Sequence, residues 1–342
     1  MTTLLVDWLG RGGIAQTSEA WVSELTSSGH EVLVVTRPGR ELAASPATAV
    51  SARQGRIRAH AAVANAAART ILDHRPATVV VQNYVIPALE WRVYEAARRV
   101  GARLILVVHD HRLHSRWAGS HAGLRRCIRA ADVVVAHTEF VAKSLGETSG
   151  RTDIVRLPLP VQLGMLSRQQ PDRPPIEKDG GLLALHFGTL QRGYKGTAAV
   201  LDLARSGVDG WRFGFIGAGA PTGVDGIQVV AGFIDGGALV SAVSHADATV
   251  LPYSYATQSG AIVLAQALGS VVVASAVGGI PEQVEHRVTG MLVDPKGPMT
   301  AWRQALDELR DPTLRGSITE AARRRVWDEH AEFTQTIETL VR

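Results

Sequence analysis

The sequence predicts an α/β protein made of two doubly wound, Rossmann-like domains that face each other across a cleft. Short apolar runs alternate with stretches of helical period along the whole chain, as is typical of βαβ units on parallel sheets. The chain has 342 residues, of which 46% are hydrophobic, and a chain of this length usually forms more than one core. Residues 161–181 interrupt the alternation near the middle of the chain with Pro171, Pro174 and Pro175.

Residues 1–160 are predicted to form the first domain. Its strand candidates are short runs rich in Val, Ile and Leu, and they lie at 4–8, 31–36, 78–82, 103–109, 133–137 and 154–157. The segments between them have helical period, most clearly at 18–27, 58–73, 91–99 and 124–130. This order predicts a parallel sheet with helices on both faces.

The alternation begins again after a linker at 161–181, so residues 182–325 are predicted to form the second domain. Its strand candidates are 182–187, 212–216, 227–230, 248–251, 271–274 and 291–293. Its helix candidates are 196–206, 236–244, 261–268 and 281–285, followed by a carboxyl-terminal pair at 299–310 and 317–340. We expect residues 326–342, at the end of this pair, to pack back on the first domain.

From the composition and the first residues we expect a cytoplasmic protein, which could also be peripheral at the inner face of the membrane. Cys127 is the single cysteine, so no disulfide can form within the chain and a reducing compartment is expected. Residues 1–6 lead directly into an apolar strand without the basic start of a signal peptide, and no apolar run approaches the length of a transmembrane helix.

The net charge of +4 is unevenly distributed. Residues 1–160 contain 20 Lys and Arg against 13 Asp and Glu, whereas residues 161–342 contain 16 against 19. A basic first half could meet an acidic acceptor or an anionic membrane surface, although ordinary solvated faces carry similar charge. Nucleic acid is not an expected partner, because no RNA- or DNA-binding signature accompanies the arginines.

The turn at Thr257, Gln258, Ser259 and Gly260 is a candidate anion site. It lies between an apolar strand and the helix at 261–268, so the unpaired amides and the positive dipole end of that helix would face the carboxyl edge of the sheet. A phosphate group would fit there. Thr and Ser are also preferred as simple helix caps, and the two interpretations are compatible.

Several motifs in order resemble those of glycosyltransferase family 4. They are GGI at 12–14 with GHEV at 29–32, VVHD at 107–110, ADVVVAHTE at 131–139, FGTLQRGYKG at 187–196, and the run from 251 to 275 with VGGIPE at 277–282 and VTGMLVDP at 288–295. The resemblance covers nearly the whole chain. It implies the GT-B fold, with a nucleoside diphosphate sugar bound mainly by the second domain and an acceptor bound by the first. It also implies sugar transfer to an acceptor hydroxyl with retention of the anomeric configuration, without a metal ion or other cofactor.

The resemblance assigns candidate residues to the donor diphosphate. Lys195 matches the lysine of the family's diphosphate loop, where an ammonium would offset the charge of the departing diphosphate. This chain has Thr189 where many members have arginine, and Arg192 could supply the missing charge. Gly12 and Gly13 are expected in the first strand-to-helix loop, where small residues would admit the diphosphate, although a flexible connection would explain them equally.

The resemblance also implies that His109 contacts the donor sugar. It ends an apolar strand at the carboxyl edge of the first sheet, and a neutral imidazole can donate a hydrogen bond to a sugar hydroxyl or to the departing group. Metal binding is a weaker alternative, because the nearby histidines lack a usual ligand spacing. By the same resemblance, the residues expected beside the nucleoside are Gly217, Gly232, Phe233, Ile234 and Leu264, although core packing would explain Phe233 equally.

The chain departs from the family at two positions. Many members carry glutamates spaced eight apart around the phosphate-binding helix, where this sequence has Ala256 and Leu264. The alternatives are therefore a catalytically inactive nucleotide-binding or scaffolding subunit and a GT-B sugar-nucleotide epimerase. The sequence does not specify the donor sugar, its base or the acceptor, which could be a small molecule, a polysaccharide or a lipid-linked glycan.

Overall fold

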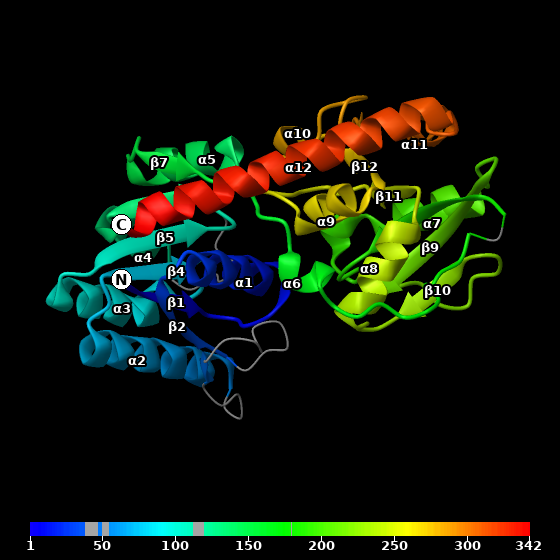
Figure 1. The fold of residues 1–342 in the computed structure, drawn as a ribbon. Coiled ribbons are helices and arrows are strands. Elements are labelled where there is room, and N and C mark those ends of the chain that lie inside the picture. The colour runs from blue at the N-terminus through cyan, green and yellow to red at the C-terminus, as the bar shows by residue number, and fades with distance from the viewer. Residues whose placement is uncertain (38–46, 50–54, 112–119, 179) are drawn as a thin grey trace. The chain divides into compact units, whose positions relative to one another are not determined.

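The computed structural model describes residues 1–37, 47–49, 55–111, 120–178 and 180–342 (Figure 1). The chain divides into two compact units, each with its own sheet. Unit 1 comprises Met1–Pro160 together with His330–Arg342, and unit 2 comprises Val161–Glu329. Both units are three-layered α/β structures, as the sequence predicts.

Unit 1 contains a seven-stranded parallel sheet in the order β3-β2-β1-β4-β5-β6-β7. The strands are β1 (Thr2–Asp7), β2 (Glu31–Thr36), β3 (Ala47–Ala49), β4 (Thr78–Gln82), β5 (Arg103–Val108), β6 (Val133–Ala136) and β7 (Ile154–Arg156). The helices are α1 (Gly12–Ser27), α2 (Arg56–His74), α3 (Pro87–Val100), α4 (Ser120–Ala130) and α5 (Glu139–Ser149).

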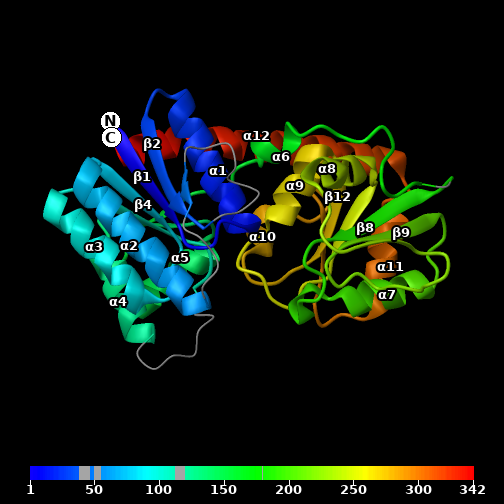
Figure 2. The same cartoon turned by 90° about the horizontal axis from the view of Figure 1, so that it is seen from below.

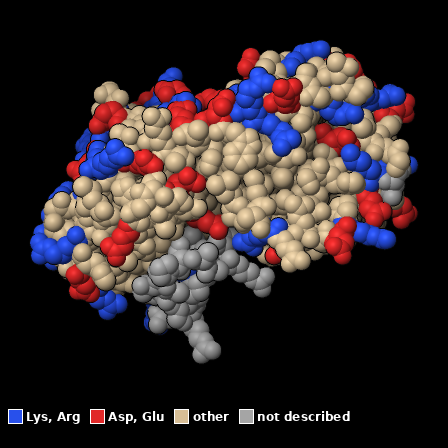
Figure 3. All heavy atoms as spheres, in the orientation of Figure 1, with Lys and Arg blue, Asp and Glu red and all other residues tan. Residues whose placement is uncertain are grey.

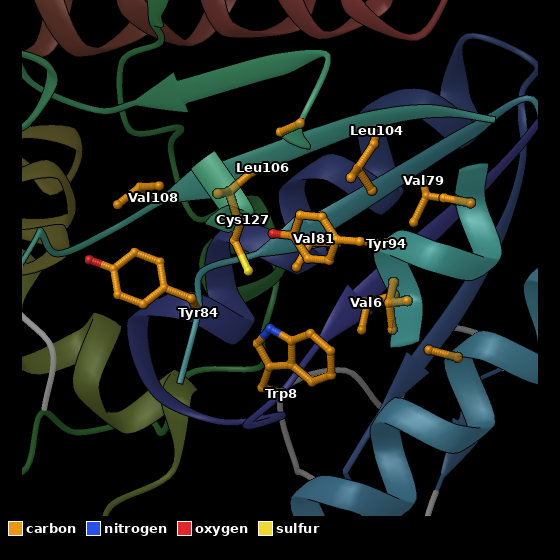
Figure 4. Close-up of a cluster of buried hydrophobic side chains, with 14 of the residues drawn as sticks. Val6, Trp8, Val79, Val81, Tyr84, Tyr94, Leu104, Leu106, Val108 and Cys127 are labelled. Atoms are coloured by element: carbon orange, nitrogen blue, oxygen red, sulfur yellow. The ribbon is translucent and has the colours of Figure 1, made fainter. Parts of the chain in front are cut away.

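The two faces of this sheet have separate cores. One face packs against α2, α3 and α4 around Trp8 and Tyr94, and Figure 4 shows the Tyr94 hydroxyl directed toward the sulfur of Cys127. The opposite face packs against α1 and the end of α12 (Pro312–Val341). There the rings of Trp21 and Phe333 meet edge to face, with centroids 5.9 Å apart. The last turns of α12 are therefore part of the unit 1 core.

Unit 2 contains a six-stranded parallel sheet in the order β10-β9-β8-β11-β12-β13. The strands are β8 (Leu182–Phe187), β9 (Trp211–Gly217), β10 (Gln228–Ala231), β11 (Ala248–Leu251), β12 (Val271–Ser275) and β13 (Met291–Val293). The helices besides α12 are α6 (Leu163–Leu166), α7 (Thr197–Arg205), α8 (Gly236–His245), α9 (Gly260–Leu268), α10 (Ile280–Gln283) and α11 (Met299–Glu308). Figure 2 shows α8 and α9 on one face of the sheet and α7 and α11 on the other.

Several boundaries differ from those expected. The segment 161–181, expected as a linker, clusters with unit 2, where Met165 and Ile176 are buried in its core. Helix α1 begins at Gly12 rather than near residue 18, so Gly12 and Gly13 form its first turn instead of a loop. Helix α5 and strand β3 were not among the elements named from the sequence.

Lys, Arg, Asp and Glu side chains are interspersed over the face shown in Figure 3. Within the described part of the chain, no helix is both long and apolar enough to cross a membrane.

Candidate functional site

The order of the strands shows where each unit would bind a ligand. In unit 2 the chain runs from β8 to β9 and β10 on one side, and then returns to β11 on the other side of β8. Ligands of open α/β sheets bind outside the carboxyl ends of the strands at such a switch point. The relevant loops of unit 2 are therefore 188–196, after β8, and 252–259, after β11. In unit 1 the switch point lies between β1 and β4.

Glycines let the loops of unit 2 pack backbone against backbone. Gly217 has φ +135°, and a Cβ atom there would lie 1.8 Å from the carbonyl oxygen of Gly188. The amide of Gly188 donates to the carbonyl oxygen of Ile216 at 2.9 Å, and the amide of Gln191 donates to that of Ala218 at 3.0 Å. Gly217, expected beside the nucleoside, therefore holds the candidate diphosphate loop against β9.

Lys195 lies at the end of a short 3₁₀ turn (Gly193–Lys195) in this loop. Its Nζ donates a hydrogen bond to Tyr253 Oη at 2.8 Å and is 4.0 Å from the centroid of the Tyr253 ring. The next residue, Gly196, is left-handed with φ +69°, and a Cβ atom there would lie 2.1 Å from the carbonyl oxygen of Pro252. Lys195 is therefore placed between the two loops of the switch point. Thr189 and Arg192 are on the same loop, and both side chains are exposed.

His186 lies at the carboxyl end of β8 and is fully buried. Its Nδ1 is 2.8 Å from the carbonyl oxygen of Val250, and its Nε2 is 3.2 Å from Thr197 Oγ1. Burial lowers the pKa of His186 to about 4; the bond to Val250 opposes this shift, and the charge of Lys195 adds to it. The imidazole is therefore neutral near pH 7, and Lys195 supplies the positive charge at this point.

The turn before α9 is already hydrogen-bonded. The amide of Ser259 donates to Gln283 Oε1 at 2.7 Å, and Gln283 Nε2 donates back to the carbonyl oxygen of Ser259 at 3.3 Å. Thr257 and Ser259 are buried, and Gln162 Nε2 donates to the carbonyl oxygen of Gly260. An anion bound by the amide of Ser259 would have to displace Gln283. Gln258 lies on the same turn and is half-buried.

The two positions that carry glutamate in many members of family 4 are part of the unit 2 core. Ala256 and Leu264 are buried in the apolar cluster formed with α8 and α9. Gln266, a polar residue on the same helix as Leu264, does not replace these carboxylates. Its Nε2 donates to the carbonyl oxygens of Gln283 and Thr289 at 3.1 and 3.2 Å. The described structure therefore places apolar side chains where the family pattern has carboxylates.

The segment expected beside the base follows β10. Gly232 is left-handed with φ +92°, and its amide donates to the carbonyl oxygen of Gly217 at 3.1 Å. The Phe233 side chain is 71% exposed, while Ile234 packs against the core of α8 and α9. This hydrogen bond connects the segment to the same glycine that holds the β8 loop.

In unit 1, polar side chains meet at the carboxyl ends of three adjacent strands. His109 follows β5, and its Nε2 is 2.9 Å from Oε1 of Gln82, the last residue of β4. The ring of His137, which follows β6, has its centroid 4.6 Å from that of His109. His137 Nδ1 donates to the carbonyl oxygen of Leu157 at 2.9 Å. All three polar side chains are buried.

Both histidines of this group are neutral at physiological pH. Burial, followed by the neighbouring His137, lowers the pKa of His109 well below its usual value of 6.5. Burial also lowers the pKa of His137 to about 4, although the hydrogen bond to Leu157 opposes the shift. This edge of the sheet can therefore exchange hydrogen bonds with neutral polar groups.

Asp7 is the hydrogen-bonding centre of the loop between β1 and α1. Its Oδ1 accepts from the amides of Leu9 and Gly10 at 2.8 and 3.0 Å, and its Oδ2 accepts from Ser18 Oγ at 3.0 Å. These bonds hold the loop after β1 and connect it to α1 through Ser18. Burial raises the pKa of Asp7, and the three hydrogen bonds and Arg37 oppose that shift.

Sequence reasoning missed Asp7, Gln82, His137, Tyr253 and Gln283. The first four are polar or aromatic residues at or just after the end of an apolar strand. Their position at a strand end is the signal that could have marked them as candidate site residues. In unit 2, Thr189, Arg192, Lys195, Gly217 and the turn at 257–260 all lie at or after the carboxyl ends of strands of one sheet. Gly12, Gly13 and His109 belong to unit 1. Among the described residues, no group of three or more His, Cys, Asp or Glu side chains could hold a metal ion.

Comparison with protein families identifies both halves of the chain. Residues 12–160 match the family described as "Glycosyl transferase 4-like domain", and residues 183–311 match "Glycosyl transferases group 1". The chain consists of two glycosyltransferase domains.

Curated relatives match only part of these glycosyltransferase domains. An uncharacterized glycosyltransferase of Methanocaldococcus jannaschii is 34% identical over 105 residues, which is 30% of this chain and 26% of that protein. A D-inositol 3-phosphate glycosyltransferase of Salinispora arenicola is 40% identical over 89 residues, 24% of this chain and 19% of that protein. The chain thus matches about a quarter or less of the length of each of these relatives.

A solved structure shows that the glycosyltransferase domains have the GT-B fold. Anabaena HepE in complex with UDP and glucose superimposes with a TM-score of 0.76 at 16% identity, covering 99% of both chains. The expected fold class is confirmed.

Proposed function

We propose that the protein transfers a sugar from a nucleoside diphosphate sugar to an acceptor hydroxyl, with retention of the anomeric configuration and without a metal ion. The observation that carries this proposal is the position of Lys195, whose ammonium lies between the two loops of the unit 2 switch point. The two glycosyltransferase domain matches support the reaction class. HepE has been solved with UDP and glucose, which supports a nucleotide-sugar donor.

Lys195 is proposed to offset the charge that develops on the diphosphate as the sugar departs. A preorganised cation is an effective catalyst at that position, because it needs no reorganisation during the reaction. Arg192, exposed on the same loop, is the second candidate cation. Together these side chains would replace the metal ion that other diphosphate sites use.

His109 is proposed to contact the donor sugar as a neutral group. Its low pKa keeps the ring uncharged near pH 7, so it would exchange a hydrogen bond with a hydroxyl without adding charge. We propose front-face attack, in which the departing phosphate takes the acceptor proton. That route requires no carboxylate nucleophile, consistent with the apolar Ala256 and Leu264.

The acceptor is proposed to bind at unit 1. Helix α4 carries exposed Arg125, Arg126 and Arg129, and the Arg126 guanidinium carbon lies 3.5 Å from the centroid of the Trp91 ring. A basic surface of this kind would suit an anionic or lipid-linked acceptor at the cytoplasmic face of a membrane. Co-sedimentation with vesicles containing phosphatidylserine, compared with neutral vesicles, tests the membrane contact; equal binding to both would contradict it.

Incubation with a panel of labelled UDP-, GDP- and ADP-sugars tests the reaction. We expect one donor to stabilise the protein by about 2.7 kcal/mol at a hundredfold excess over Kd, and to release its nucleoside diphosphate slowly in the absence of acceptor. Stabilisation without any release, even with acceptor extracts, would instead favour the inactive binding subunit. Interconversion of two sugar nucleotides would favour the epimerase. NMR of the product's anomeric proton tests retention.

A further inference from the structure

The two loops of the unit 2 switch point are joined by three contacts around Tyr253. The first is the hydrogen bond from Lys195 Nζ to Tyr253 Oη, at 2.8 Å. The second joins the backbones, where the amide of Ser254 donates to the carbonyl oxygen of Tyr194 at 2.9 Å. The third is the close approach of Gly196 to Pro252, which leaves no room for a side chain. The Lys195 loop is therefore held against the loop that leads to α9.

Tyr253 is well suited to hold a flexible cation. Its side chain is 1% exposed and belongs to the apolar cluster that includes Leu251 and Ile262. The core therefore fixes the ring, and with it the position of Oη. A lysine side chain carries about 2 kcal/mol of rotamer entropy when it is free. The fixed phenol restrains the ammonium before any ligand arrives.

The Lys195 ammonium lies beside two aromatic rings. Nζ lies 4.0 Å from the centroid of the Tyr253 ring and 5.4 Å from that of Tyr194, and both distances are within the range of cation–π attraction. His186, whose charge Lys195 disfavours, stays neutral and does not repel it. The charge of Lys195 therefore remains available to an anion at the ends of β8 and β11.

We propose that Tyr253 is a positioning residue for Lys195, holding its ammonium where the diphosphate of a nucleotide-sugar donor binds. This inference rests on the proposed function, because it assumes that the β8 loop receives a diphosphate. The phenol acts through the lysine and need not touch the donor. Its contribution should therefore depend on the phosphates of the ligand and not on the nucleoside.

Tyr253→Phe tests the inference, because it keeps the ring and removes only Oη. The ligand is whichever of UDP, GDP and ADP binds the parent most tightly, with the nucleoside of the same base as the comparison. We expect calorimetry to show about a tenfold rise in Kd for the diphosphate, since a hydrogen bond to a charged group is lost, and no change for the nucleoside. Tyr194→Phe is the matched control, because its ring lies beside the same ammonium and is 42% exposed. Its Kd should equal that of the parent.

A double-mutant cycle with Lys195→Met separates positioning from packing. In the Lys195→Met background, Tyr253→Phe should have no further effect on the Kd for diphosphate. The inference would be overturned if Tyr253→Phe weakened the binding of diphosphate and nucleoside equally. It would also be overturned if Tyr253→Phe had the same effect on the Kd in the Lys195→Met background as in the parent. A normal Kd for Tyr253→Phe beside a raised Kd for Lys195→Met would overturn it as well, but leave the proposed function intact. Normal affinities for both single variants would contradict the donor site itself.

Discussion

The carboxyl edges of the two sheets are built in different ways. In unit 1 the edge consists of buried side chains, with Gln82, His109 and His137 meeting across β4, β5 and β6. In unit 2 the edge consists of loops joined backbone to backbone at glycines, with Lys195 at their junction. The first edge offers neutral hydrogen-bonding groups, whereas the second offers a positive charge. This difference agrees with the proposed function, in which unit 1 contacts hydroxyl groups and unit 2 contacts the phosphates.

The core beneath the second edge should tolerate charge least. Leu264 is 3% exposed and lies among apolar side chains of α8 and α9. Leu264→Glu should lower the free energy of unfolding by about 4 kcal/mol, because it removes apolar packing and buries a carboxylate. It should also weaken nucleotide binding. Denaturant unfolding and calorimetry on the purified variant measure both, and stability and affinity equal to the parent's would show that this helix is not core.

Substitutions at the backbone contacts of the second edge should have the next largest effect on stability. Gly217→Ala should cost about 3 kcal/mol of stability, because the residue has φ +135° and the new Cβ would overlap the carbonyl oxygen of Gly188. Gly193→Ala is the control, because Gly193 lies on the β8 loop that Gly217 contacts and a Cβ there meets no atom within 4 Å. Similar unfolding curves for the two variants would mean that the glycine contact does not hold the loop.

Acidification should destabilise the protein through the neutral histidines of both edges. His137 and His186 each have a folded-state pKa of about 4, below the ordinary value of 6.5. Between these values the unfolded chain binds more protons, so stability is complete above about pH 6.5 and is lost as the pH falls toward 4. Each histidine should contribute a slope of at most about 1.4 kcal/mol per pH unit. Urea unfolding of His137→Gln should show a shallower dependence between pH 7 and pH 5, and an unchanged slope would rule out this contribution.

Removal of divalent metal ions should have the smallest effect, here on turnover. If Lys195 and Arg192 offset the diphosphate charge, EDTA should leave turnover of the identified donor unchanged. The assay is nucleoside diphosphate release before and after chelation. Loss of turnover that magnesium or manganese restores would show that the second edge depends on a metal ion.

Periodicity predicted most strands, most helices and the division into two α/β sheets, because burial of apolar residues on sheet faces decides all of these. It did not predict the polar contacts at the strand edges. Gln82 meets His109, Lys195 meets Tyr253, and Ser259 meets Gln283, across 27, 58 and 24 positions respectively. Such pairs depend on strand register and loop geometry, which no local pattern encodes. The start of α1 was also misplaced, because its first turn contains Gly12 and Gly13, residues that are more typical of a loop.

Lys195 in unit 2 is proposed to bind the diphosphate of the donor. The most direct test of this proposal is calorimetric titration of the preferred nucleoside diphosphate, and of the matching nucleoside, into the parent and Lys195→Ala. Loss of a charge-assisted contact should cost roughly 1.5–3 kcal/mol, which raises the Kd for the diphosphate by about ten- to a hundredfold. The affinity for the nucleoside and the melting temperature should not change. A diphosphate Kd for Lys195→Ala equal to that of the parent would show that Lys195 does not bind the diphosphate.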